Sequence, residues 1–195
     1  MPRHLMLFAN LLFLLPVALT AQETAPEPAP TPEAPYDSAP AATPEGPMTL
    51  DRLDAIVRAL DPEAQSNGSM WQITINEVQV LIVTDVTADR MRAITPVAQT
   101  DEVSPEDMQR ILQANFDTAL DARYAIAKDI LWSAYIHPLT PLQKDQLISG
   151  LGQVVNLARS YGTLYSGGAL QFGGGDSGAL QRQLIDELLK KGEDI

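Results

Sequence analysis

Three strand patterns follow one another with short links, and this grouping constrains the fold more than any other feature of the sequence. The three segments are residues 70–75, 78–84 and 90–97. The first alternates apolar and polar residues, and the second is rich in β-branched residues, which favour strands. Links this short favour antiparallel neighbours. Strands that are grouped, and do not alternate with helices, predict an α+β fold with helices packed on an antiparallel sheet.

Two predicted helices frame these strands. Thr49 can cap the first helix, which ends at Asp61-Pro62. The second begins at Ser104-Pro105, where a cap, a proline at the first position and acids in the first turn all favour a helix N-terminus. Its predicted inward stripe has five members: Met108, Ile111, Leu112, Asn115 and Phe116.

The second half of the chain repeats the order of strands and then a helix. Two strands are predicted at residues 122–127 and 130–137. A helix then begins after Thr140, whose position before Gln143 fits a capping box, and it stops at Gly162. The predicted order is α-β-β-β-α-β-β-α, over a domain of residues 48–162.

Apolar residues occupy both faces of the central strands. A sheet with one wet face shows polar residues at every second position, so this pattern indicates that both faces need cover. Trp132 and Phe116 are interpreted as core beneath the helices. The predicted binding groove on the other face consists of Leu81, Val83, Leu131 and Tyr135. The domain's own helices, a dimer partner and a bound peptide are the alternatives for its cover.

The N-terminal residues 1–21 have the layout of a secretory signal peptide. Arg3 precedes an uncharged apolar run, and small residues lead up to Ala21. Residues 22–47 hold 8 of the 15 prolines and five acids, with no Lys or Arg. Such a composition predicts an extended, disordered linker. We therefore expect a periplasmic or secreted protein whose mature chain begins near Gln22.

The C-terminal residues 163–195 form a glycine-rich arm followed by a helical pattern. The apolar stripe of that helix comprises Leu180, Leu184, Ile185, Leu188 and Leu189. A helix this short is marginal in water unless it buries its stripe. Folding back over the second face of the sheet is preferred; capping a dimer mate and binding a partner are the alternatives.

One succession of residues resembles a known family. The helix end Ile111-Leu112-Gln113-Ala114-Asn115-Phe116 precedes a strand pair through Trp132, the turn Ile136-His137-Pro138-Leu139-Thr140 and a helix that ends Ala158-Arg159-Ser160-Tyr161. This order resembles the YbjN-like and type III secretion chaperone-like (CesT-like) families. The resemblance implies a small, acidic, often dimeric protein that holds protein segments without ATP.

Composition excludes several kinds of chemistry. The chain has no cysteine, which excludes disulfides and thiolate sites. Its formal net charge of −12 argues against nucleic acid and anionic lipid as partners. His137 alone does not make a metal site, and no cofactor is expected. Asn115 is expected to bond nearby backbone.

The glycine-rich segment carries a weak catalytic motif. Gly175-Asp176-Ser177-Gly178 looks like the nucleophile segment of trypsin-like proteases, but that chemistry needs a paired base, and His137 lacks the required context.

Taken together, these features of the sequence predict an exported, non-catalytic peptide- or protein-binding module that is chaperone-like. The alternatives are a structural envelope dimerisation module and a serine hydrolase that uses Ser177.

Overall fold

The computed structural model describes residues 45–117, 120–161 and 178–193. Its helices are α1 (Leu50–Leu60), α2 (Pro105–Asp117), α3 (Lys144–Ser160) and α4 (Gly178–Lys191), with a short 3₁₀ turn at Thr100–Glu102. The signal peptide, linker residues 22–44 and most of the glycine-rich arm lie outside the described residues and stay predictions.

The strands form one sheet. They are β1 (Gln65–Ser66), β2 (Met70–Ile75), β3 (Val78–Asp85), β4 (Arg90–Gln99), β5 (Arg123–Ala127) and β6 (Ile130–Pro138). The order across the sheet is β1-β2-β3-β4-β6-β5, and every neighbouring pair is antiparallel. The predicted α+β class and antiparallel sheet are confirmed, while the short β1 was not predicted.

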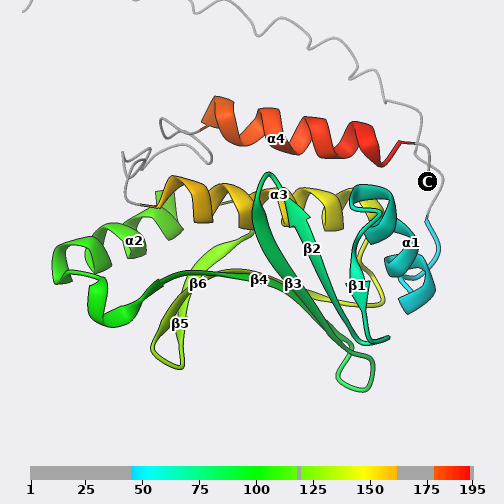
Figure 1. Ribbon diagram of the computed structural model, residues 1–195, viewed down its shortest axis with the longest axis horizontal. Helices are drawn as coiled ribbons and strands as arrows, with labels where there is room; N and C mark the ends of the chain where they lie inside the picture. The colour runs from blue at the N-terminus through cyan, green and yellow to red at the C-terminus, as the bar shows by residue number, and fades with distance from the viewer. Residues whose placement is uncertain (1–44, 118–119, 162–177, 194–195) are drawn as a thin grey trace, which may run out of the picture. The chain divides into compact units, whose positions relative to one another are not determined.

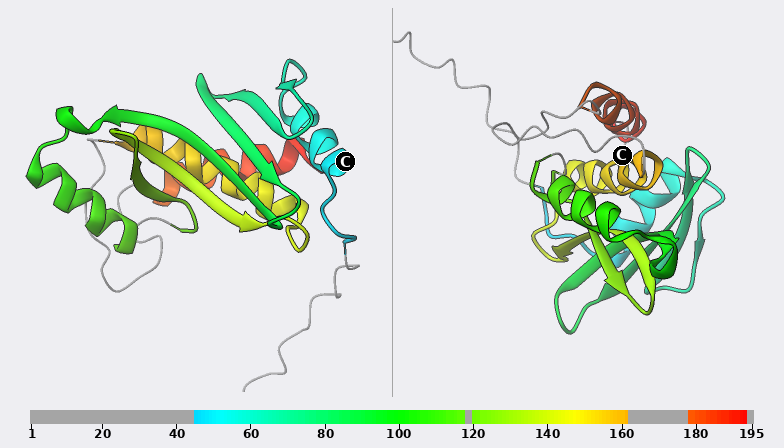
Figure 2. Two further views of the ribbon diagram at one scale, coloured as in Figure 1. Left: turned by 90° about the horizontal axis from the view of Figure 1, so that it is seen from below. Right: turned by 90° about the vertical axis from the view of Figure 1, so that its left-hand side faces the viewer.

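The helices gather on one side of the sheet (Figure 1). Helix α3 lies along the strands, and α4 lies on the side of α3 that faces away from them. Helix α1 contacts β2, and α2 contacts β5. The end-on view in Figure 2 shows the same arrangement, with the strands on one side of the helical layer. We call the helix-covered side of the sheet the inner face and the opposite side the outer face.

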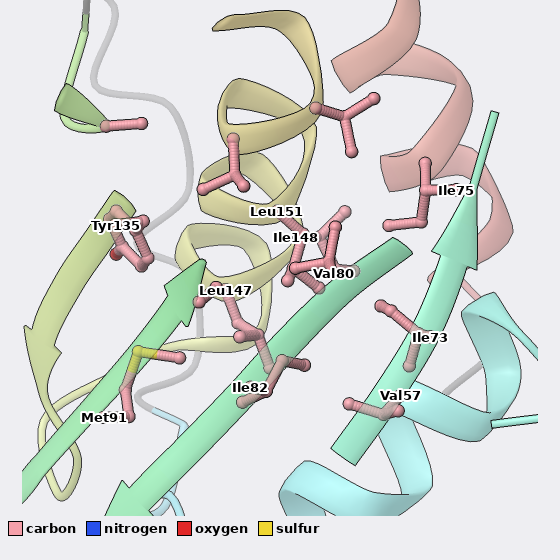
Figure 3. Close-up of a cluster of buried hydrophobic side chains, with 14 of the residues drawn as sticks. Val57, Ile73, Ile75, Val80, Ile82, Met91, Tyr135, Leu147, Ile148 and Leu151 are labelled. Carbon is pink, nitrogen blue, oxygen red and sulfur yellow. The ribbon is translucent and has the colours of Figure 1, made fainter. Parts of the chain in front are cut away.

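The core lies between α3 and the inner face (Figure 3). From the sheet it receives Ile73, Ile75, Val80, Ile82, Met91, Ala93 and Tyr135, and from α3 it receives Leu147, Ile148, Leu151, Val154 and Val155. In β2 the burial alternates strictly, so that Trp71, Ile73 and Ile75 are buried as predicted. Burial of each such side chain contributes about 1.5–3 kcal/mol, so this interface dominates the stability of the fold.

Two-residue turns fix the register of two hairpins. Asn76 and Glu77 join β2 to β3 with φ values of 45° and 68°. Lys128 and Asp129 join β5 to β6 with φ values of 52° and 60°. Positive φ at both central positions matches the right-handed twist of the flanking strands. The register of each hairpin follows, and with it the face on which each side chain lies.

Helix α1 is tied to the sheet by a buried indole. Thr49 caps the helix as predicted, with its Oγ1 accepting from the Arg52 N–H at 3.2 Å. The buried Trp71 donates from Nε1 to Asp54 Oδ1 at 2.8 Å, and Arg58 donates to the other oxygen at 2.9 Å. These bonds, that from Arg58 first, lower the pKa of the Asp54 carboxyl.

The helix α3 begins later than predicted. Its N-cap is Gln143, which forms a capping box with Gln146, and not Thr140. Thr140 instead donates from its N–H and its Oγ1 to Asp89 Oδ1, both at 2.7 Å. The threonine therefore ties the β6–α3 connection to the turn between β3 and β4. Its hydroxyl bonds Asp89, which is distant in the sequence, and so does not cap the helix. The spacing of residues in the sequence gives no sign of this contact.

The inward stripe predicted for α2 is partly wrong. Ile111 and Ala114 are buried, but Leu112 is 64% exposed and Phe116 71% exposed. Phe116 is therefore not core. Asn115 explains the rotation of the helix: its side chain accepts from Tyr124 N at 2.7 Å and donates to Tyr124 O at 3.1 Å. This pair of bonds, of the backbone type predicted for Asn115, holds α2 against the edge strand β5.

Helix α4 packs on α3, not on the outer face of the sheet as preferred from the sequence. Leu184, Ile185 and Leu188 are buried. A Cβ at Gly152 of α3 would lie 2.9 Å from Cγ1 of Ile185, so the glycine permits the close contact of the two helices. Lys144 Nζ donates to Gly192 O at 2.7 Å at the C-terminal end of α4, where a cation is favoured.

We expect Asp54→Asn to reduce stability at neutral pH and to have a smaller effect in acid. The pKa of Asp54 is lowered by folding, so its ionised form stabilises the fold above the ordinary Asp pKa and this contribution is lost as the pH falls. Asparagine keeps an acceptor for Trp71 but removes the charge. Thermal melts between pH 7 and pH 2 measure the difference.

The matched control is Asp186→Asn, an exposed carboxylate on α4. It should leave the melting temperature unchanged at each pH. A destabilisation by Asp54→Asn that is equal at pH 7 and pH 2 would contradict the proposed role of the Asp54 charge.

Candidate functional site

The four predicted groove residues do not share one face. Leu81 and Val83 lie on the outer face of β3 and are partly exposed, as predicted. Leu131 and Tyr135 are 1% and 4% exposed and lie in the core on the inner face. Assignment of these two residues to the exposed face of β6 is therefore wrong.

The pairing of β6 with β4 explains this correction. Ile136 lies opposite Arg92, and Trp132 lies opposite Pro96, on the outer face. Trp132 is only partly buried and donates from Nε1 to Ala127 O at 3.0 Å, so it is not core. The inner positions of β6 include the fully buried Ser133, a small polar residue between Leu131 and Tyr135.

Tyr135 fits against α3 because a glycine faces it. A Cβ on Gly150 would lie 2.5 Å from Cε1 of the tyrosine ring, so any larger residue there would displace it. The ring stacks on His137, with 5.9 Å between the centroids and 21° between the planes. Burial, with a smaller effect of the Asp121 charge, raises the pKa of Tyr135 to about 12. Its hydroxyl therefore stays protonated at all physiological pH values.

The outer face carries a continuous apolar band across β2, β3, β4 and β6. The register brings together Met70, Leu81, Val83, Ile94, Pro96, Trp132, Ala134 and Ile136. Met70 is 38% and Ile136 60% exposed. No helix of the described residues covers this band (Figures 1 and 2). A sheet face with uncovered apolar side chains on several strands is typical of an interaction surface.

The outer band has a polar edge and a cationic centre. Gln72, Thr74 and Gln79 make the exposed positions at the β2–β3 end polar. Arg92 lies between Val83 and Ile136 in the register, is exposed, and forms no ion pair within the described part of the chain. An apolar band with an unpaired guanidinium suits an extended segment that offers apolar and acidic side chains.

A separate cleft opens between β6, the start of β5 and helices α3 and α4. Its volume is roughly 580 Å³. The lining residues are Asp121, Arg123, Tyr135, Ile136, His137, Asp145, Gln146, Ser149 and Leu189. Most of these side chains are polar, which distinguishes the cleft from the apolar band.

The buried Gln153 lies behind this cleft and holds two of its lining residues, Asp121 and Ser149. Its Oε1 accepts from Asp121 N at 2.7 Å and from Ala122 N at 2.9 Å. Its Nε2 donates to Ser149 Oγ at 3.1 Å and to Asp121 Oδ2 at 3.3 Å. The amide thus ties the chain before β5 to α3, and β5 pairs with β6 only as far as Ala134.

The other chemistry considered from the sequence gains no support. Ser177 lies outside the described residues, and His137 directs its Nδ1 at the carbonyl of Pro138, 2.7 Å away. Within the described ranges, no group of three or more His, Asp or Glu side chains is placed to hold a metal ion. Among the helices that the structure describes, none combines the length and apolar content needed to cross a membrane.

Several residues of the band were missed from the sequence. Ile94 and Arg92 lie on the outer face of β4, where Arg90 and Arg92 alternate with the buried Met91 and Ala93. That alternation marks the outer face of β4 and was a usable signal. The pairing of β4 with β6, which carries the band on to Ile136, had no sequence signal, because the two strands are separated by α2 and β5.

Comparison with known proteins found similarity among solved structures. No protein-family model and no curated protein matches the chain. A similar solved structure is the Yersinia pestis type III secretion chaperone SycH in complex with a stable fragment of YscM2. The TM-score is 0.42 and the sequence identity 18%, over 55% of this chain and 97% of that chain. The resemblance to the YbjN-like and CesT-like families stays a prediction.

We expect substitutions to aspartate on β6 to have different effects on stability at its inner and outer faces. Leu131→Asp and Tyr135→Asp place a charge in the core and should destabilise the domain by several kcal/mol, enough to unfold it. Trp132→Asp and Ile136→Asp lie on the outer face and should cost about 1 kcal/mol or less. Circular dichroism melts of the four variants measure the difference. Unfolding by Ile136→Asp, or a native melt for Leu131→Asp, would reverse the assignment of faces.

Proposed function

We propose that this protein is an exported, non-catalytic module that binds peptide or protein segments in a chaperone-like manner. The observation that carries the proposal is the uncovered apolar band on the outer face, defined above from Met70 to Ile136. The export part of the proposal is supported by the apolar N-terminal run and the proline-rich linker of the sequence.

The band is better suited to extended segments than to a small molecule. It runs across four strands with partly exposed side chains at Leu81, Val83 and Ile94, and it is a surface of the sheet, not an enclosed cavity. Binding such a surface gains energy mainly by removing apolar area from water. A few central residues of an interface of this kind provide most of the binding energy.

The charge on the outer face indicates which kind of segment it would bind. The chain carries a formal net charge of −12, yet Arg92 on β4 is an exposed cation in the middle of the outer band, without an ion pair in the described part of the chain. A segment with acidic residues next to apolar ones would pair with this guanidinium group, whereas a basic segment would be repelled by it. We therefore propose apolar, acidic, extended segments as the preferred ligands.

We expect Leu81→Asp and Ile94→Asp each to weaken binding about tenfold or more while the domain stays folded. The measurement is fluorescence anisotropy of a labelled, permanently unfolded acidic protein, such as reduced and carboxymethylated α-lactalbumin. Both substitutions introduce a charge in the centre of the band, where binding removes water.

The matched control is Thr74→Asp, which adds the same charge to the polar edge of the same face. It should change the affinity by less than a factor of two or three. An equal loss for all three variants would indicate a general charge effect, and unchanged binding in Leu81→Asp and Ile94→Asp would contradict the proposal.

A second candidate function, a structural dimerisation module, is favoured by another surface. Leu112 and Phe116 on α2 are largely exposed, and Ile126 on β5, which α2 contacts, is 51% exposed. If a second copy covers these residues, Leu112→Asp with Phe116→Asp should convert a dimer into a folded monomer in sedimentation velocity. A wild-type chain that sediments as a monomer at high concentration would contradict this candidate.

A further inference from the structure

The polar cleft beside β6 meets the apolar band at Ile136 and has an unused hydrogen-bonding group at its wall. Tyr135 is 4% exposed, and its hydroxyl forms no hydrogen bond within the described part of the chain. Among the described residues, Ser133 Oγ is the one fully buried side-chain polar atom without a partner, so the unbonded Tyr135 oxygen is accessible from the cleft, where a ligand can reach it. The tyrosine lines the cleft and interacts electrostatically with Asp121 across it.

Two carboxylates face the same cleft from different elements. Asp121 precedes β5 and is held there by Gln153, as described above. Asp145 lies in the first turn of α3 and accepts no hydrogen bond from the described residues. The two carboxylates are far apart in the sequence, so it is the fold that brings them to one cleft.

Two other polar side chains of the cleft already form hydrogen bonds to neighbouring backbone. Arg123 donates to the carbonyls of Leu120 and Ala122. Gln146 accepts from Gln143 N at 3.0 Å in the capping box. The acceptors that stay available in the cleft are the carboxylate of Asp145, the second oxygen of Asp121 and the oxygen of Tyr135.

The formal charge of the lining is negative. Two aspartates oppose the single guanidinium of Arg123, which leaves −1 with His137 neutral. A monovalent cation that donates hydrogen bonds would neutralise the cleft and occupy the available acceptors. A primary ammonium group offers three rotatable donors, which suits acceptors that come from three separate elements.

Apolar side chains on the rim provide room for a carbon stem. Ile136 and Leu189 belong to the lining, from β6 and from the C-terminal half of α4. A long aliphatic stem buries its methylene groups on such residues while its charged end reaches polar partners. We infer that the cleft binds a primary ammonium group on an aliphatic chain, with Asp121, Asp145 and Tyr135 as its ligands.

This inference does not rest on the proposed function. Its proposed ligands Asp121, Asp145 and Tyr135 are not members of the outer band, although the two surfaces share Ile136 at the end of β6. Two sources offer the same chemistry: a lysine side chain of a protein, and a free aliphatic diamine.

The test uses small probes on the full chain. Isothermal titration and amide chemical shifts are recorded with N-acetyl-lysine-N-methylamide and with the uncharged isostere N-acetyl-norleucine-N-methylamide. We expect the lysine probe to bind and to shift the amides of Asp145, Ser149 and His137. The norleucine probe should bind at least tenfold more weakly. No binding of the lysine probe, or equal binding of both, would overturn the inference.

Two variants locate the site. Tyr135→Phe removes a hydroxyl that bonds nothing in the free protein, so the fold should be kept, and Asp145→Asn changes an exposed residue. Each should weaken the lysine probe about fivefold to tenfold, while the control Asp186→Asn, an acid on α4 outside the cleft, should have no effect. Unchanged affinity in both cleft variants would overturn the assignment of the site.

A parallel titration with 1,5-diaminopentane separates the two sources. Tighter binding of the diamine than of the capped lysine would identify a free amine as the ligand. The opposite order would identify a lysine side chain. If Leu81→Asp binds the lysine probe normally, the cleft is also shown to work independently of the outer face.

Discussion

The packing of α3 on the inner face of the sheet is the contact on which the rest of the structure depends. It buries the apolar stripe around Leu151 against Val80, Ile82 and Met91, in the hydrophobic core of the domain. Gly150 lets the helix approach closely enough to cover the ring of Tyr135. Because α3 covers the central strands of this face, the residues of β3, β4 and β6 that point toward it are buried and the residues between them lie on the outer face.

Both candidate surfaces follow from that arrangement. Residues that cannot lie beneath α3 emerge on the outer face, where Leu81, Ile94 and Ile136 join into an apolar band. The cleft arises at the margin of the same interface. There Gln153 of α3 bonds the chain before β5, and the end of β6 beyond Ala134 is paired with β4 on one side but not with β5 on the other.

The sequence predicted the class of fold and most elements because periodicity and caps are local. It failed where partners are distant. On β6, the sequence predicts the large Trp132 in the core and Tyr135 on the outer face. The structure has the opposite arrangement, because the pairing with β4 and the close packing against α3 place Tyr135 on the inner face. On α2, the bonds of Asn115 to β5 turn Phe116 outward. Leu81 was placed on the correct face because the alternation of β3 is regular.

The central claim, that α3 covers one face of the sheet and leaves the other open, has a direct test. Solvent paramagnetic relaxation of methyl groups, with a neutral gadolinium chelate, reports how closely water-borne molecules approach each side chain. The account predicts strong relaxation of Leu81, Ile94 and Ile136 methyls and weak relaxation of Ile82 and Leu151. Equal protection of Leu81 and Ile82 would contradict it, since the outer face would then be covered as completely as the inner one.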